Sequence, residues 1–383
     1  MIFPDAMLGM LGGGQLGRMF TLAAHSMGYR VTVLDPDPLS PAGAVADVHL
    51  RAAYQDKEAL QQLADTCAAV TTEFENVPAG SLRWLAAHCT VRPTGDSVAI
   101  AQDRIREKRF LADNGFGTAP FAIIEHESDL SRCDSALFPG ILKRARFGYD
   151  GKGQSRVANV TEALAAFQRM GSEACLLEQF VTLACEVSVV VTRGADGAVL
   201  SFPVAENQHS NGILDVCIVP ARVAAELARQ AESAAADVAT RLDYRGVLAV
   251  EFFVTPEGSL LVNEIAPRPH NSGHYTIDAC ATSQFEQQVR ALCGLPLGDT
   301  RLLTPVVMVN LLGEAWDNGE PAWQKLFDNP RAKLHLYGKH EARAGRKMGH
   351  FTVFGADANV EGALNDALKI RTAMCAQNNR AVA

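Results

Sequence analysis

The first hundred residues alternate between short apolar runs and longer segments with helical spacing. The apolar runs predict strands at residues 7–11, 31–34 and 68–72. The intervening and following segments predict helices at residues 15–28, 56–67 and 81–88. Strands that alternate with helices are typical of an open parallel α/β sheet. We therefore expect a Rossmann-like domain over residues 1–101.

After residue 101 the predicted helices and strands alternate less regularly. Helical spacing predicts helices at residues 102–114, 161–170, 221–242 and 360–375. Short apolar runs predict strands at residues 120–124, 141–145, 155–158, 175–178, 305–313, 333–337 and 350–354. A length of 383 residues, at roughly 150 residues per domain, indicates two or three domains.

Residues 247–276 predict a β-hairpin that brings two carboxylates together. Two apolar runs flank the turn-forming Pro256-Glu257-Gly258. A two-residue turn at Glu257-Gly258 places Glu251 directly opposite Glu264, where like charges repel unless a cation neutralises them. Magnesium prefers one or two carboxylates together with phosphate oxygens. The alternative is an exposed hairpin with two unrelated glutamates, because a one-residue slip would separate the pair.

Glycines 12, 14 and 17 follow the first strand in a G-x-G-x-x-G pattern, and the second strand runs into Asp35. This spacing satisfies the dinucleotide fingerprint. A tight turn at a helix N-terminus will hold any phosphate, however, so a phosphate-binding or purely structural turn is favoured over a NAD site. Glu73, at the end of the third strand, could bind a sugar hydroxyl or be a solvated loop acid.

Several cations and glycines further along the chain could hold phosphates. Arg104 and Lys108 lie on one side of a helix, and Lys143 lies inside a strand, where a lone cation is unusual. Residues 147–154 form a glycine-rich loop that is not a Walker loop and could close over phosphates or be a plain flexible turn. The turn at residues 345–350 carries two adjacent cations and is either a surface turn or an anion contact.

Composition limits the classes of partner. The chain has 35 basic and 43 acidic residues, and the net charge of -8 argues against nucleic acid as a partner. Nine cysteines form no C-x-x-C pair, which favours reduced thiols over disulfides or a zinc site. The sequence has no 18-residue apolar run and no signal-peptide pattern, so we expect a cytoplasmic protein without membrane contact.

The joint order of these motifs resembles the ATP-grasp superfamily. The segments GGGQLGRM, TTEFENVP, GYDGKGQ, NEIAPRPHNSGHYT and GRKMGH resemble, more closely, the 5-(carboxyamino)imidazole ribonucleotide synthetases, over residues 7–355. The resemblance implies an α/β and α+β fold: a Rossmann-like pre-ATP-grasp domain at 1–101, an ATP-grasp domain at 102–300 with a lid subdomain at about 115–180, and a small β-rich C-terminal domain at 301–383. It also implies a homodimer. Ala266 stands where many superfamily members have Asn, so a third protein ligand to the metal is not expected.

The resemblance also implies roles for individual residues. ATP would contact Arg104, Lys143, Gly148, Tyr149, Asp150, Gly151, Lys152, Gly153, Gln154, Glu178, Gln179, Phe180, Val181, Glu186, His209, Asn263 and Glu264. Magnesium would be held by Glu251 and Glu264. The substrates would contact Gln15, Leu16, Glu73, Asn271, Arg346 and Lys347, of which the first three would bind aminoimidazole ribonucleotide. Bicarbonate, its phosphorylated form and the attacking amine would be surrounded by the catalytic residues Tyr149, Asp150, Lys152, Arg268, His270 and Lys347.

The implied activity is the carboxylation of aminoimidazole ribonucleotide by bicarbonate, through carboxyphosphate, with release of ADP and phosphate. Another ATP-grasp ligase with a different acceptor is the nearest alternative. The interpretation as a NAD-dependent oxidoreductase is supported only by residues 12–35. A non-catalytic ATP-binding protein would give no reason for Glu251, Glu264, Lys143 and Lys347 to occur together.

Overall fold

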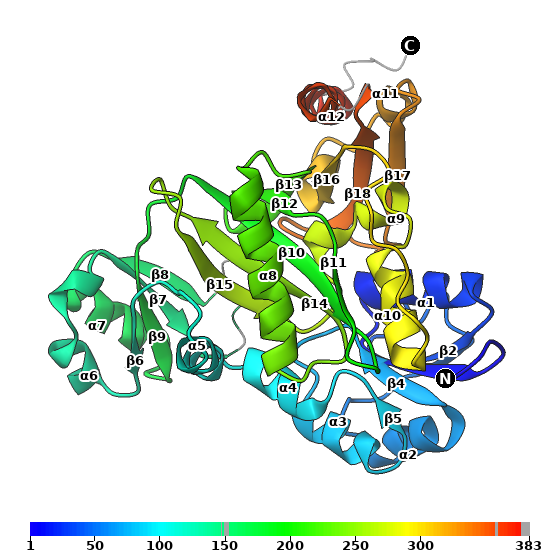
Figure 1. The fold of residues 1–383 in the computed structure, drawn as a ribbon, viewed down its shortest axis with the longest axis horizontal. Coiled ribbons are helices and arrows are strands. Elements are labelled where there is room, and N and C mark those ends of the chain that lie inside the picture. Colours follow the sequence, from blue (N-terminus) through cyan, green and yellow to red (C-terminus); the bar gives the residue numbers. More distant parts are fainter. Residues whose placement is uncertain (147, 149–152, 357–358, 377–383) are drawn as a thin grey trace.

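The computed structural model describes residues 1–146, 148, 153–356 and 359–376. Within these residues the chain forms sheets of five, nine and four strands, with helices packed around them (Figure 1). The expected mixed α/β class is therefore confirmed. Among the described helices none is both long and apolar enough to cross a membrane.

The N-terminal sheet is parallel throughout, in the order β3-β2-β1-β4-β5. Its strands are β1 (Met7–Leu11), β2 (Arg30–Leu34), β3 (Val48–Leu50), β4 (Ala69–Thr72) and β5 (Thr90–Val91). The helices of this region are α1 (Gln15–Ser26), α2 (Lys57–Thr66), α3 (Ala79–Ala86) and α4 (Gly95–Ala101). Helix α1 packs on one face of the sheet, and α2 and α3 pack on the other. Since both faces are covered, the central strands are continuous apolar runs.

A four-stranded antiparallel sheet, in the order β6-β9-β7-β8, forms a separate layer at the left of Figure 1. Its strands are β6 (Phe121–Ile124), β7 (Gly140–Arg144), β8 (Gln154–Val157) and β9 (Cys175–Gln179). The helical segments around it are α5 (Arg104–Asp113), α6 (Glu127–Arg132), η1 (Ser135–Leu137) and α7 (Val160–Arg169). The start of α5 is fixed by Asp103, whose carboxylate accepts the N–H groups of Ile105 and Arg106.

The nine-stranded sheet is the centre of the molecule, in the order β15-β14-β10-β12-β13-β16-β18-β17, with β11 paired to β10. Its strands are β10 (Cys185–Arg193), β11 (Val199–Ser201), β12 (Ala205–Ser210), β13 (Ile213–Val219), β14 (Gly246–Val254), β15 (Leu260–Ala266), β16 (Val306–Leu312), β17 (Ala332–Leu336) and β18 (Lys347–Phe354). The helical segments around it are α8 (Ala225–Arg241), η2 (Asn271–Gly273), α9 (Thr276–Ala279), α10 (Gln284–Cys293), η3 (Gly313–Trp316), α11 (Gln324–Phe327) and α12 (Val360–Cys375). Helix α8 crosses one face of β10 and β14 (Figure 1) and packs through residues at helical spacing.

Helix α10 was not predicted, and it joins the two large sheets. Its apolar residues Phe285 and Val289 pack on the N-terminal sheet, while Gln288 is buried between the sheets. The Gln288 side chain donates to Thr71 Oγ1 at 2.6 Å and accepts the Val247 N–H at 2.6 Å. Buried glutamines interrupt the apolar pattern of this helix, so the pattern alone did not reveal it.

We expect Gln288→Met to lower the free energy of unfolding by about 2–4 kcal/mol, because the Val247 N–H and the Thr71 hydroxyl would both be left buried without this partner. Urea unfolding followed by circular dichroism measures the loss. Gln230→Met, at an exposed position on α8, is the matched control and should change little. Equal stability of the two variants would contradict a joining role for Gln288.

Candidate active site

The β14–β15 hairpin places Glu251 directly opposite Glu264, as predicted, but by a different route. The expected two-residue turn is wrong: Val254 pairs with Leu260, which leaves a five-residue connection. That register alone would put Asn263 opposite Glu251. A β-bulge between the pairs of Glu251 and Phe252 takes up one residue of β15 and restores the carboxylate pair.

The two carboxylates differ in their surroundings. Glu264 lies 2.9 Å from Arg104 Nη1. Burial by itself would raise the pKa of Glu264, but the positive charge of Arg104 lowers it to about 2. Burial and the negative charge of Glu264 raise the pKa of Glu251 to about 7. The raised pKa shows that a second negative charge is costly here, so a cation between the two carboxylates would be bound favourably.

The donor set fits a hard divalent cation. Both groups are carboxylates, and the nearby Asn263 Oδ1 is buried without a hydrogen-bond partner in the described chain. Within the same residues no group of three or more His, Cys, Asp or Glu side chains is gathered for a metal. Two carboxylates completed by oxygens of a bound phosphate suit magnesium.

A buried cluster of cations lies beside this pair. Glu178 forms ion pairs with Lys143 Nζ and with Lys108 Nζ, the latter at 2.8 Å. Glu178 lies two pairs along from Lys143 on the adjacent strand, because its direct partner is Ile141. Burial, together with the positive charges of Arg104 and Lys108, lowers the pKa of Lys143 despite Glu178. Two buried lysines thus share one carboxylate, which favours the binding of an anion beside them.

Glu107 was not assigned a role from the sequence, and Lys108 was considered only as a possible anion contact, yet both side chains position the hairpin. Lys108 Nζ donates to the backbone oxygen of Asn263 at 2.8 Å. Glu107 accepts the N–H of Ile265 at 2.5 Å, and burial with the nearby Glu264 raises its pKa to about 8. The only sequence signal was their place in the helix, three and four residues after Arg104.

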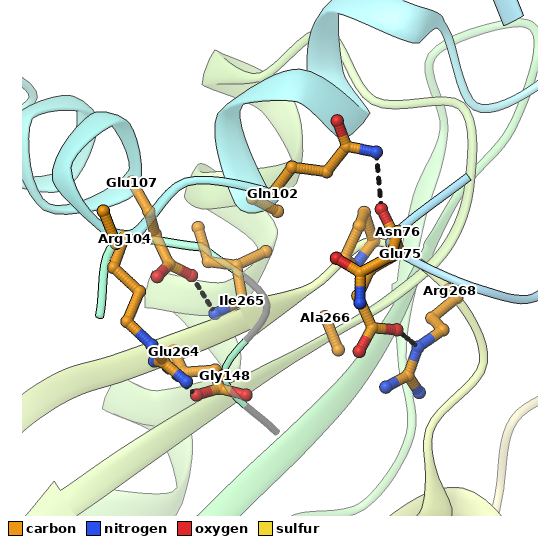
Figure 2. Close-up of a pocket in the computed structure, with 13 residues that line it drawn as sticks. Glu75, Asn76, Gln102, Arg104, Glu107, Gly148, Glu264, Ile265, Ala266 and Arg268 are labelled. Carbon is orange, nitrogen blue, oxygen red and sulfur yellow. Dashed lines mark hydrogen bonds and ion pairs between the residues drawn. The ribbon is translucent and has the colours of Figure 1, made fainter. Parts of the chain in front are cut away.

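Figure 2 shows the cavity between α5, the end of β15 and the loop after β4. Arg104 and Glu264 lie on one side of it, and Glu75 and Arg268 form an ion pair on the other. Glu75 was part of the TTEFENVP segment but was not named as a site residue. The cavity is lined by Glu75, Asn76, Ala101, Gln102, Arg104, Glu107, Ala145, Gly148, Glu264, Ile265, Ala266, Pro267 and Arg268.

Three of the residues expected to contact ATP, at positions 178, 180 and 186, already have partners within the chain. The Glu178 carboxylate lies between two lysines. Phe180 is 37% exposed, and the Arg156 guanidinium lies 4.0 Å from its ring centroid. Glu186 Oε2 lies 3.2 Å from His209 Nδ1. Burial opposes protonation of His209, but Glu186 raises its pKa overall.

The N-terminal glycine loop is closed by two carboxylates. Glu73 accepts the Gly14 N–H at 2.6 Å and the Gly17 N–H at 2.9 Å. Asp35 accepts the Gly13 N–H at 2.7 Å and the Tyr54 hydroxyl at 2.6 Å. Both carboxylates therefore hold the loop, and this engagement of Asp35 disfavours the NAD interpretation, in which its carboxylate would bind a ribose.

The loop after β15 supplies three more of the expected residues. His270 Nε2 lies 3.2 Å from Glu251 Oε1. Burial and the positive charges of Arg268 and Lys347 lower the pKa of His270 to about 3, so the imidazole is neutral at neutral pH. Asn271 is 6% exposed, and neither atom of its amide has a hydrogen-bond partner in the described chain. Such an amide is suited to a ligand that would satisfy it.

The C-terminal turn and the glycine-rich loop complete the expected set. Lys347 begins β18, and its positive charge opposes the rise in the pKa of Glu251 that burial and Glu264 cause. Arg346 donates to the Glu341 backbone oxygen at 2.9 Å. Gly148 lines the cavity of Figure 2, and Gln154 pairs with Lys143. Four expected residues lie outside the described part of the chain: Tyr149, Asp150, Gly151 and Lys152.

Comparison with known families gives three consecutive matches. A ribonucleotide synthetase pre-ATP-grasp domain matches residues 6–102, an ATP-grasp domain matches residues 109–285, and a phosphoribosylaminoimidazole carboxylase C-terminal domain matches residues 306–361.

Individual relatives are similar over nearly the whole chain. The N5-carboxyaminoimidazole ribonucleotide synthase of Bacillus subtilis is 46% identical over 352 residues, which are 92% of either chain. The Brucella melitensis enzyme of the same name is also 46% identical, over 91% of this chain and 96% of its own.

Solved structures also resemble this chain over nearly its whole length. An ADP complex of an N5-carboxyaminoimidazole ribonucleotide synthetase superposes with a TM-score of 0.91 at 44% identity, covering 96% of this chain and 97% of the other. The Aspergillus clavatus enzyme, in complex with ADP and 5-aminoimidazole ribonucleotide, has a TM-score of 0.86 at 30% identity, covering 96% of this chain and 98% of its own. The chain therefore belongs to the N5-carboxyaminoimidazole ribonucleotide synthase family of ATP-grasp enzymes.

Proposed function

We propose that this protein is an ATP-dependent ligase that carboxylates 5-aminoimidazole ribonucleotide with bicarbonate in purine biosynthesis. The observation that carries the proposal is the Glu251–Glu264 pair beside the Lys143 cluster, in a chain of this family. Carboxylates for a cation and buried lysines for phosphates are the parts that phosphoryl transfer from ATP requires.

The proposed first step is attack of a bicarbonate oxygen on the γ-phosphate of ATP, which forms carboxyphosphate and ADP. Lys143 would neutralise charge on the phosphates, since it shares the carboxylate of Glu178 with Lys108. Arg104 would hold Glu264 ionised and add positive charge near the phosphates. Magnesium, held by Glu251 and Glu264, would supply charge stabilisation at the phosphate oxygens.

In the proposed second step the bond between the carboxyl carbon and the bridging oxygen of carboxyphosphate breaks, which gives carbon dioxide and inorganic phosphate. The substrate amine then attacks the carbon dioxide and passes one proton to the released phosphate, which gives the carbamate. Arg268, held by Glu75, and the unpartnered amide of Asn271 would bind bicarbonate or its phosphorylated form. Lys347 would add positive charge on that side. The family relation further supports roles for Tyr149, Asp150 and Lys152 in closing the site against water.

The ribonucleotide would bind at the N-terminal sheet. Gln15 and Leu16 begin α1, and the N-terminus of a helix favours a phosphate. Glu73 already accepts two loop N–H groups, and a sugar hydroxyl would donate to its remaining lone pairs. By the same family relation we propose domains at residues 1–101, 102–300 and 301–383, a homodimer and a cytoplasmic location.

The test is ADP release by the purified protein with magnesium and ATP. We expect release to require both bicarbonate and aminoimidazole ribonucleotide, and the product to be an acid-labile carbamate of that ribonucleotide. A folded protein that turns over ATP only with another amine acceptor would replace this proposal with a different ATP-grasp ligase. A folded protein without any ATP turnover would exclude a ligase.

A further inference from the structure

The surroundings of His270 determine which of its ring nitrogens carries the proton. The Ser272 N–H donates to His270 Nδ1 at 3.3 Å, and the Ser272 hydroxyl lies 2.9 Å from the same nitrogen. A backbone N–H can only donate, so Nδ1 must present its lone pair. The proton of the neutral ring is then on Nε2, which faces Glu251 Oε1 at 3.2 Å. A carboxylate oxygen can only accept a hydrogen bond, so a proton on Nε2 agrees with the contacts on both sides of the ring.

Two further buried residues, Asn207 and Ser188, fix the direction in which the hydrogen bonds around His270 donate. Asn207 Nδ2 donates to Ser188 Oγ at 2.8 Å, and the Ser188 hydroxyl donates to Ser272 Oγ at 2.7 Å. Ser272 therefore has its own hydroxyl proton left to donate to His270 Nδ1. All three residues are at most 5% exposed. The hydrogen bonds run from Asn207 through both serines to Nδ1 of the imidazole, and Nε2 on the other side of the ring lies 3.2 Å from Glu251 Oε1.

The backbone of His270 is fixed independently of its ring. The Gln284 amide, fully buried on α10, accepts the His270 N–H at 2.9 Å and donates to the His270 carbonyl oxygen at 2.7 Å. The ring is thus held at its backbone by one helix and at Nδ1 by η2. Little freedom remains for the imidazole to turn its other nitrogen toward Glu251.

We infer that Asn207, Ser188 and Ser272 form a positioning relay that holds His270 as the Nε2–H tautomer, so that it orients Glu251 and is not itself a metal ligand. The inference rests on the proposed function, because it takes Glu251 as a ligand of the cation. An imidazole that presents N–H offers no lone pair to a metal. The relay would therefore keep the donor set all oxygen, which favours magnesium over metals such as cobalt or zinc that accept imidazole nitrogen.

The direct test is the tautomer of His270 in the nucleotide-free protein. Histidine labelled with ¹⁵N is followed by multiple-bond ¹H–¹⁵N correlation, and the His270 pattern is identified by its loss in His270→Gln. We expect an unprotonated Nδ1 and a protonated Nε2 at neutral pH. In Ser272→Ala the pattern should shift toward the Nδ1–H form. A wild-type pattern with the proton on Nδ1, or one unchanged in Ser272→Ala, would overturn the relay.

A second readout is metal preference. The affinities of Ser272→Ala for Mg²⁺ and Co²⁺ are measured by calorimetry with ADP present. We expect the affinity for Mg²⁺ to fall about tenfold relative to the affinity for Co²⁺, because loss of a group that orients a metal ligand typically has an effect of this size. Thr192→Val is the matched control, because Thr192 lies on β10 four residues from Ser188, is fully buried and has a hydroxyl without a partner in the described chain. An unchanged metal preference in Ser272→Ala would contradict the role in selectivity.

The outcomes separate the relay from the proposed function. If the Nε2–H form is present but no carboxylation occurs, the relay stands and the proposed reaction fails. If carboxylation occurs with the proton on Nδ1, the reaction stands and the relay fails. Should Ser272→Ala not fold, Ser188→Ala removes the donor to Ser272 from the neighbouring strand and is expected to shift the same His270 pattern in the same direction.

Discussion

Replacing Glu264 by Gln is expected to lower ATP-dependent turnover by about 10³-fold, the upper part of the range for loss of one group that stabilises transition-state charge. The substitution removes one of the two opposed carboxylates and leaves Arg104 without its partner at 2.9 Å. Steady-state ADP release with saturating magnesium measures the change. Because the side chain keeps its size, circular dichroism should show an unchanged fold.

The matched control for Glu264 is Glu257→Gln in the same hairpin. Glu257 is exposed in the connection between β14 and β15 and is no part of the cavity. Its replacement should leave turnover within about twofold of wild type, as for most surface substitutions. If Glu264→Gln retained the activity of this control, the carboxylate pair would not be the cation site.

Replacing Glu178 by Gln is expected to lower the free energy of unfolding by about 3–5 kcal/mol at pH 7, because Lys143 and Lys108 would remain buried without their counter-charge. Chemical denaturation measures the loss. Glu173→Gln, an exposed position just before β9, is the control. A Glu178 variant as stable as this control would show that the lysine charges are compensated elsewhere.

The stabilisation by Glu178 should depend on pH in a defined direction. Burial alone would raise the pKa of Glu178, but Lys143 and Lys108 lower it from 4.5 to about 2. The unfolded chain therefore binds a proton at higher pH than the folded chain does. The stabilisation is complete above the unfolded pKa and is lost as the pH falls toward 2. The difference between wild type and Glu178→Gln should be about 1 kcal/mol smaller at pH 4 than at pH 7.

The hairpin illustrates how a local pattern can lead to the correct contact for an incomplete reason. The alternation of apolar residues and the turn at Pro256-Glu257-Gly258 were sufficient to predict two paired strands. The turn is longer than expected, and the bulge that restores the Glu251–Glu264 pair lies several residues away from it. A bulge depends on packing and on contacts such as Lys108 to the Asn263 carbonyl, which have no local signature.

The sequence by itself determined most of the regular elements, the glycine loop at the first helix and the family to which the chain belongs. These depend on hydrophobic spacing, turn residues and short motifs, all of which are local. Helix 360–375 was predicted with the same limits as α12. Only the tertiary structure decided which charges meet. Glu178 joins Lys143 and Lys108 because β9 lies beside β7 and α5 packs over it. Ser272 meets Ser188 because η2 lies against β10. Such contacts depend on sheet order and register between segments far apart in the chain, which no local pattern specifies.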